Sequence, residues 1–247
     1  MKQTRILMGM PITVEIADES AVEEAINNIF TYFEYVESKF SVYKQTSEIS
    51  LFNKGEISED EFSDDMKKIF ELSEETKKLT NGYFDIKSDK KYDPSGLVKG
   101  WAIYNAAQLL KDMGFKNFYV EAGGDIQAYG KNGEGQFWKV GIKNPFEQTQ
   151  IVKAVRIENK GIATSGTYIR GQHIYNPKDN NKPAVEIISL TVIGPNIYEA
   201  DRFATAAFAM GKKGIEFIEG LKGFEGYMID YNGTATMTGC FEKYVLK

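Results

Sequence analysis

The chain has 247 residues, 42% hydrophobic and 26% charged, a composition typical of a folded protein with one large core or two closely packed lobes. Its net charge of −5 and pI near 5.2 argue against non-specific binding of nucleic acid or anionic membranes, because those partners need a basic surface. Cys240 is the only cysteine, which excludes an internal disulfide and a multi-thiolate metal cluster within one chain. A phosphate-bearing ligand must therefore be held locally, by backbone amides, a lysine or a metal ion.

The N-terminal residues 1–16 lack a long apolar stretch followed by a small-residue cleavage site. No later window reaches the ~18 apolar residues of a membrane span, so no integral membrane segment is expected. These features predict a cytoplasmic protein. An exported or lipid-anchored protein whose leader is missing from the sequence is the alternative.

Apolar periodicity predicts the first elements of the chain. Residues 5–17 are expected to form a strand, and a helix headed by Ser20 follows, with Glu23 at capping-box spacing. Apolar side chains recur in this helix at intervals of three and four residues and share one face: Val22, Ile26, Ile29, Phe33 and Val36.

A polar, turn-rich segment then leads to a second helix, predicted over residues 64–79 and terminated by Asn81 and Gly82. The sequence "GYFDI" is expected to be a short strand. A loop, "DPSGLVKG", leads into a helix predicted over residues 100–113.

The second half is predicted to be mainly β structure, with strands before and after a glycine break in "FKNFYVEAGGDIQAYG". Further strands are expected in "FWKVGIKNP", "AVRIENKGIATSGTY" and "EIISLTVIG". A helix with a glycine-marked break then precedes a hairpin that turns at Asn232-Gly233. Strands and helices mix without regular βαβ alternation, so the predicted class is α+β, with mixed, largely antiparallel sheets and packed helices.

Asp201 and Thr205 lie four residues apart in "ADRFATAAFAMG". If this stretch is helical, a carboxylate and a hydroxyl lie side by side on one face. Two oxygen ligands at this spacing suit Mg²⁺, which completes its octahedron with water and phosphate oxygens. The alternative interpretation is a solvated polar stripe on an otherwise apolar helix.

Two glycine-containing segments are further candidates. In "DPSGLVKGWAIYN", Gly96 and Gly100 would let the backbone approach a ligand, and Lys99 would add a charge for phosphate. The segment matches neither the P-loop nor the dinucleotide fingerprint, and an ordinary helix entry with a surface lysine is the alternative. In "EAGGDIQAYG", a turn before Asp125 would expose the carboxylate, although Gly-Gly-Asp is equally good hairpin chemistry.

His173 is the only histidine, and imidazole is the one side chain that exchanges a proton near neutrality without special tuning. A surface or structurally hydrogen-bonded histidine is the alternative interpretation. Ser165 lies eight residues before it but lacks a G-x-S-x-G elbow, so a Ser-His-Asp hydrolase has little support.

Sequence blocks between residues 8 and 211, taken in order, are more specific than any one of them. They read "MGMPITVEI", "FSVYKQTSEISLFNKG", "GYFDI", "SGLVKGWAIYNAAQLLKDMGFKNFYVEAGGDIQAYG", "VGIKNP", "IATSGTYIR", "HIYNP" and "TVIGPNIYEADRFATAAFAMG". Together they resemble the successive motifs of the ApbE family, the FAD:protein FMN transferases. The resemblance implies an ApbE-like, T-fold-like architecture in a single domain over residues 1–247, built of one unit or two intimately packed lobes.

The resemblance also implies an activity. Enzymes of this family use Mg²⁺ to transfer the FMN half of FAD to a threonine or serine hydroxyl of an acceptor flavoprotein, and they release AMP. The implied metal ligands are Asp201 and Thr205 of the A-D-x-x-A-T block and the backbone carbonyl of Val98 in the G-x-A-K-G block. Such a metal would neutralise charge on the phosphates and on the departing AMP.

The H-I-x-D-P block implies that His173 is the catalytic base, which accepts the proton of the incoming hydroxyl. Tyr43 lies in the block that supplies an aromatic side chain against the flavin. The residues expected to contact FAD are Met8, Tyr43, Lys99, Gly123, Gly124 and Asp125.

The chain departs from the family pattern after the histidine. Asn176 stands where the family has aspartate, and the threonine-glycine pair that normally follows is absent. The altered loop leaves open a Mg²⁺-dependent FAD pyrophosphatase that yields FMN and AMP. A non-catalytic FAD carrier is a second alternative, disfavoured because the metal-ligand pair and His173 are all retained and binding alone needs no base.

Overall fold

The computed structural model describes residues 1–88, 91–167, 174–179 and 182–246. Its central element is an eight-stranded sheet with the order β1-β2-β5-β6-β9-β12-β13-β14, in which neighbouring strands run antiparallel. The strands are β1 (Lys2–Leu7), β2 (Met10–Ile16), β5 (Phe118–Ala122), β6 (Asp125–Tyr129), β9 (Lys160–Gly166), β12 (Ile187–Gly194), β13 (Glu225–Asp230) and β14 (Ala235–Met237).

The α-helices of the described chain are α1 (Glu23–Phe40), α2 (Glu48–Lys54), α3 (Asp64–Leu79), α4 (Ser95–Asp112), α5 (Ile197–Ala209) and α6 (Gly214–Glu219). Short two-stranded sheets pair β3 (Lys87–Ser88) with β4 (Lys91–Tyr92), β7 (Trp138–Lys143) with β8 (Ile151–Ile157), and β10 (Tyr175–Asn176) with β11 (Lys182–Pro183). Single 3₁₀ turns occur at Glu59–Glu61, Pro177–Asp179, Gly211–Lys213 and Phe241–Lys243. Among the described residues, no helix combines the length and apolar character needed to cross a bilayer.

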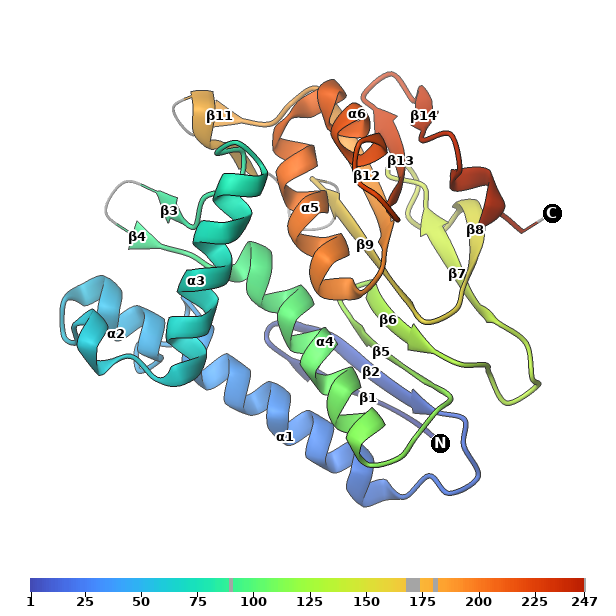
Figure 1. Ribbon diagram of the computed structural model, residues 1–247, viewed down its shortest axis with the longest axis horizontal. Helices are drawn as coiled ribbons and strands as arrows, with labels where there is room; N and C mark the ends of the chain where they lie inside the picture. The colour runs from blue at the N-terminus through green and yellow to red at the C-terminus, as the bar shows by residue number, and fades with distance from the viewer. Residues whose placement is uncertain (89–90, 168–173, 180–181, 247) are drawn as a thin grey trace.

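Two apolar cores lie on opposite faces of the large sheet. Helices α1, α4 and α5 cover one face, where Phe33, Phe118 and Phe208 are fully buried (Figure 1). The hairpin β7–β8 lies on the other face, and its Trp138 packs in a smaller core with Phe241. Burying each large apolar side chain contributes about 1.5–3 kcal/mol, so both layers hold the sheet in place.

Several sequence predictions are confirmed. Helix α3 has the predicted bounds, and Asn81 and Gly82 after it adopt left-handed φ angles of 50° and 80°. The glycine break between β5 and β6 and the break between α5 and α6 are present. The last hairpin turns at Asn232-Gly233, where Gly233 has a φ of 80°.

Predictions at the N-terminus were wrong in two respects. Residues 5–17 form two strands rather than one, because Met8 and Gly9 take left-handed φ angles of 53° and 71° and reverse the chain. Helix α1 begins at Glu23, after an N-cap, Val22, that makes no side-chain cap hydrogen bond, so the Ser20 capping box is absent. Val22 is 54% exposed, whereas the other four residues of the predicted apolar face are buried.

Three local predictions in the middle of the chain were also wrong. The turn-rich segment contains α2, whose N-terminus is capped by the side chain of Ser47. "GYFDI" forms no strand, because the Thr80 hydroxyl accepts a hydrogen bond from the backbone N–H of Phe84 and holds the chain in an irregular loop. Helix α4 begins at Ser95 rather than at residue 100. The Asp93 carboxylate accepts a 3.0 Å hydrogen bond from the Ser95 backbone N–H at this start.

Helix α5 crosses the sheet at very short range. A methyl group at Gly161 on β9 would lie 2.0 Å from the backbone nitrogen of Ile197. That nitrogen donates a 2.8 Å hydrogen bond to the side-chain oxygen of Gln127, a fully buried residue on β6. The start of α5 is therefore fixed against two strands of the sheet.

We expect Gly161→Ala to lower the free energy of unfolding by roughly 1–3 kcal/mol, because the added methyl must push α5 away from β9. Gly133→Ala is the matched control, since a methyl group there meets nothing within 4 Å. Urea denaturation of both variants measures the difference. Equal stability would contradict the close approach of α5.

Candidate functional site

A cavity of about 270 Å³ lies where α4 and α5 meet the end of β9. The loop after α3 and the residues around β10 form further parts of its wall. The lining residues that bear on the chemistry are Tyr83, Lys99, Gly123, Ser165, Asp201 and Thr205.

Asp201 and Thr205 lie on α5, and both line the cavity, as their spacing predicted. The Asp201 Oδ2 atom accepts a 2.8 Å hydrogen bond from the backbone N–H of Gly100, and the Thr205 hydroxyl donates to the Gly96 carbonyl at 3.4 Å. Both backbone groups belong to the first turns of α4, and each has a partner on α5. These bonds bring a carboxylate, a hydroxyl and a carbonyl together.

The two glycines of this segment lie inside α4 rather than before it. A methyl group at Gly100 would lie 2.6 Å from the Asp201 Cβ atom, and one at Gly96 would lie 3.3 Å from the Thr205 Cγ2 atom. Their lack of a side chain therefore lets α4 and α5 approach each other. The solvated-stripe interpretation of α5 is wrong, because Asp201 is only 2% exposed.

Lys99 bridges two buried carboxylates. Its Nζ atom lies 2.5 Å from the Asp125 Oδ2 atom and 3.4 Å from the Asp201 Oδ1 atom. The other oxygen of Asp125 accepts a 2.9 Å hydrogen bond from the Thr164 backbone N–H on β9. The surface-lysine interpretation is therefore wrong, and one ammonium facing two carboxylates leaves a local excess of negative charge that favours a further cation.

Burial is the main cause that raises the pKa of Asp201 from 3.8 to about 7. The positive charge of Lys99 opposes this shift, and the nearby Asp125 carboxylate adds to it. The Gly100 N–H bond also favours the charged form. A cation bound beside Asp201 would replace the solvation that the buried carboxylate has lost.

The donor atoms fit Mg²⁺, which prefers hard oxygen ligands and keeps several waters or phosphate oxygens. Asp201 and Thr205 supply the carboxylate and the hydroxyl. The carbonyl that the structure places against the Thr205 hydroxyl belongs to Gly96, two residues before Val98, which is buried in the first turns of α4. In the described part of the chain, no cluster of three or more His, Cys, Asp or Glu side chains forms a metal cage.

The remaining predicted FAD contacts lie partly outside the cavity lining. The turn at Met8 and the turn at Gly123-Gly124 are neighbours, because the Gly123 backbone N–H donates to the Pro11 carbonyl at 3.0 Å. Gly123 lines the cavity, whereas neither Met8 nor Gly124 belongs to its lining. Tyr43 is 90% exposed and also lies outside the lining.

The sequence missed the aromatic wall of the cavity, which consists of Tyr83, Phe84 and Tyr175. The block "GYFDI" carried the signal for two of them but was interpreted as a strand. His173 lies outside the described residues, and the two residues that follow it in the chain, Ile174 and Tyr175, line the cavity. Ser165 lies in strand β9, so it does not form the strand-to-helix elbow of a hydrolase.

The fold and cavity define an α+β protein with a buried, lysine-bridged carboxylate pair suited to a cation and an anionic ligand. The ApbE family model matches residues 8–91 and 87–228. The chain therefore belongs to the ApbE family, as the ordered sequence blocks indicated.

Curated relatives include the FAD:protein FMN transferase of Escherichia coli (strain K12), 31% identical over 155 residues, which is 59% of this chain and 44% of that protein. The enzyme of the same name from Haemophilus influenzae is 31% identical over 138 residues, 51% of this chain and 40% of that protein. The matches thus cover less than half of the length of these relatives.

Solved structures show the same fold at full coverage. Flavin transferase ApbE from Vibrio cholerae has a TM-score of 0.85 and 21% identity, over 99% of this chain and 98% of that chain. The ApbE protein from Thermotoga maritima has a TM-score of 0.87 and 20% identity, over 100% and 99%. At these identities the likeness confirms the predicted α+β, ApbE-like architecture.

The raised pKa of Asp201 predicts how stability depends on pH without metal. Between 3.8 and about 7 the folded protein holds this proton more tightly than the unfolded chain, so the free energy of unfolding falls as pH rises. Asp201→Asn has no proton to lose. We expect the variant to gain stability relative to the wild type between about pH 5 and about pH 8, measured by urea denaturation with a chelator present. Parallel pH profiles would contradict the shift.

Proposed function

We propose that this chain uses Mg²⁺ to transfer the FMN half of FAD to a threonine or serine hydroxyl of an acceptor flavoprotein, forming a phosphoester and releasing AMP. The observation that carries the proposal is the oxygen set of Asp201, Thr205 and Gly96, which lines one cavity with Lys99, the partner of the buried Asp125. The name FAD:protein FMN transferase, borne by relatives of the chain, supports it.

The chemistry of the cavity fits part of FAD. Its volume, about 270 Å³, is slightly below the ~300–1,000 Å³ of typical small-molecule pockets, so it would take a portion of a dinucleotide. Lys99 offers a positive charge to the pyrophosphate, and the wall of Tyr83 and Tyr175 offers flat surfaces to a ring. Contacts of Met8, Tyr43, Gly124 and Asp125 with FAD stay predictions from the family resemblance.

Mg²⁺, held by Asp201, Thr205 and a backbone carbonyl of α4, would supply charge neutralisation for the phosphates. The Gly96 carbonyl lies against the Thr205 hydroxyl and is one candidate for this ligand, and the carbonyl of Val98 stays the prediction from the resemblance. Lys99 would offset part of the negative charge of Asp125 and Asp201 while the substrate phosphates approach.

We assign the general base to His173. In this step the imidazole accepts the proton of the acceptor hydroxyl, and the hydroxyl oxygen forms a bond to the FMN phosphorus. The bond from that phosphorus to the bridging oxygen breaks, and AMP departs with its electron pair. This role is supported by Ile174 and Tyr175, the next two residues in the chain, which line the cavity.

The test is mass spectrometry of a threonine-bearing acceptor flavoprotein incubated with the chain, FAD and Mg²⁺, with AMP measured in parallel. We expect the acceptor to gain the mass of an FMN phosphoester. His173→Ala should still bind FAD, followed by flavin fluorescence, but transfer should fall by about 100-fold or more because the base is lost.

The other outcomes separate the alternatives. AMP release without any acceptor would favour the FAD pyrophosphatase, and FAD binding with neither AMP nor modified acceptor, across several acceptors, would favour the carrier. Asp201→Ala tests the proposed metal ligand and should abolish the Mg²⁺-dependent activity. An unchanged dependence on Mg²⁺ would contradict the assigned metal site.

A further inference from the structure

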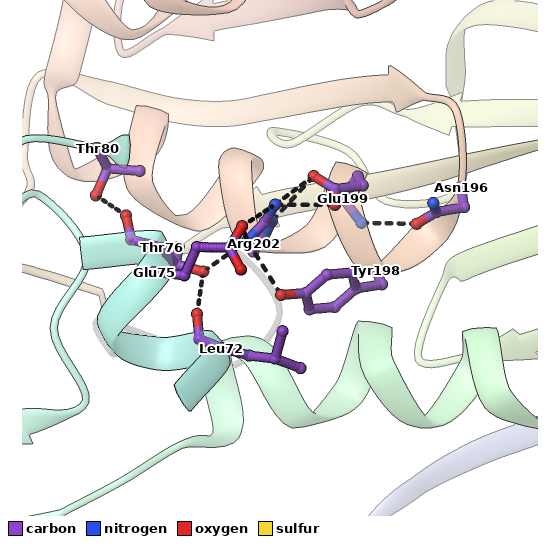
Figure 2. A network of polar contacts seen from close by, with 8 residues as sticks. All are labelled: Leu72, Glu75, Thr76, Thr80, Asn196, Tyr198, Glu199 and Arg202. Carbon is purple, nitrogen blue, oxygen red and sulfur yellow. Dashed lines mark hydrogen bonds and ion pairs between the residues drawn. The ribbon is translucent and has the colours of Figure 1, made fainter. Parts of the chain in front are cut away.

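Arg202, next to Asp201 on α5, is a buried cation outside the cavity lining. It is 4% exposed, and its guanidinium reaches toward α3 (Figure 2). The Glu199 carboxylate takes three hydrogen bonds from it at 2.8–3.0 Å, in the forked geometry that suits arginine. Glu75 of α3 forms a second, longer ion pair with it at 3.4 Å.

Neutral groups complete the guanidinium contacts. The Nη1 atom donates to the Tyr198 hydroxyl and to the Thr76 hydroxyl, both at 3.1 Å. Thr76 is a fully buried residue of α3, and its hydroxyl in turn donates to the Leu72 carbonyl at 2.7 Å. Arg202 of α5 is therefore bound to α3 by an ion pair with Glu75 and by a neutral hydrogen bond to Thr76.

Further hydrogen bonds connect the end of α3 to the cavity wall. At the end of α3, the Thr80 hydroxyl donates to the Thr76 carbonyl at 2.8 Å and accepts from the Phe84 backbone N–H at 3.1 Å. Phe84 lines the cavity, and a methyl group added at Gly96 would lie 3.4 Å from the Phe84 ring and 3.3 Å from the Thr205 methyl.

Hydrogen bonds therefore run from Arg202 through Thr76 and Thr80 to Phe84. Beside the Phe84 ring lies Gly96, whose carbonyl accepts from the Thr205 hydroxyl, about one turn further along α5 than Arg202. Glu199 moves with α5, so a rotation of α5 that moved Thr205 would have to break the bonds from Arg202 to Thr76 and Glu75 of α3 or displace the loop after α3. Such hydrogen-bonded partners outside the ligand set commonly control metal affinity.

We propose that Arg202 is a positioning residue: through the Thr76–Thr80–Phe84 relay it fixes Asp201 and Thr205 against the cavity wall and so sets the Mg²⁺ affinity of the site. The proposal rests on the proposed metal site and adds a residue that contacts neither metal nor substrate. A purely structural role would make Arg202 matter for stability alone.

The experiment is isothermal titration of Mg²⁺ into the metal-free protein at about pH 8, above the pKa of Asp201. Arg202→Lys keeps the charge but loses the guanidinium whose Nη1 atom bonds Thr76 of α3, and we expect the Mg²⁺ dissociation constant to rise about 10-fold. Thr80→Val keeps the shape and the guanidinium but cuts the relay, so the constant should rise in the same direction. This second variant carries the test where Arg202→Lys folds poorly.

Asp18→Ala is the control for lost stability. Its carboxylate accepts from the backbone N–H groups of Lys116 and Asn117, remote from the cavity, so thermal unfolding should occur at lower temperature while the Mg²⁺ dissociation constant stays within about two-fold of wild type.

If Arg202→Lys and Thr80→Val bind Mg²⁺ as the wild type does, the positioning role is overturned and the proposed function stands. If the wild type itself binds no Mg²⁺, the assigned metal site fails, and the positioning role fails with it.

Discussion

The close approach of α4 and α5 is the contact on which the rest of the site depends. Two glycines in α4 cost helix stability, about 1 kcal/mol each relative to alanine, yet only a missing side chain lets the Gly100 N–H reach Asp201. The same approach brings the Gly96 carbonyl to the Thr205 hydroxyl. A loss of local helix propensity is thus offset by contacts between two helices that are about a hundred residues apart in the chain.

The charge balance of the site follows from this packing. Asp125 and Asp201 are buried, and Lys99 is the cation that the structure places between them. Buried charges are costly unless they are paired, and one ammonium cannot compensate two carboxylates. The raised pKa of Asp201 and the preference for a divalent cation therefore have one origin, since a proton and a metal ion would each neutralise the same uncompensated negative charge.

Local patterns in the sequence predicted what depends on a few neighbouring residues. The spacing of Asp201 and Thr205 was sufficient, because a helix places i and i+4 on one face. The Lys99–Asp125 ion pair could not be predicted from local sequence, because it depends on how the tertiary fold packs helix α4 against strand β6. The burial of Arg202 could not be predicted for a related reason. Arginine side chains are usually exposed to solvent, and only the packing of α3 on α5 shows that this one is buried.

The first turns of α4 and the loop after α3 illustrate the opposite error, in which local propensity was overruled. Glycines suggested a loop, but contacts with α5 support a helix there; "GYFDI" suggested a strand, but the Thr80 hydroxyl bends it into the cavity wall. Both errors fall at the candidate site. Departures from local preference are expected where a fold gives up regularity for function, so their position is itself an argument for the site.

Helix α5 explains how such a site can be rigid. Of its residues, Glu199 and Thr205 alone are not buried. The helix is therefore packed against neighbouring elements on nearly all sides, and this packing restricts its movement. Its start is bound to Gln127, its cavity side to α4 and its remaining side to α3 through Arg202. Ligands on an element held from three sides need little rearrangement when a cation and phosphates arrive, which is the condition under which fixed charges act most strongly on a phosphoryl group.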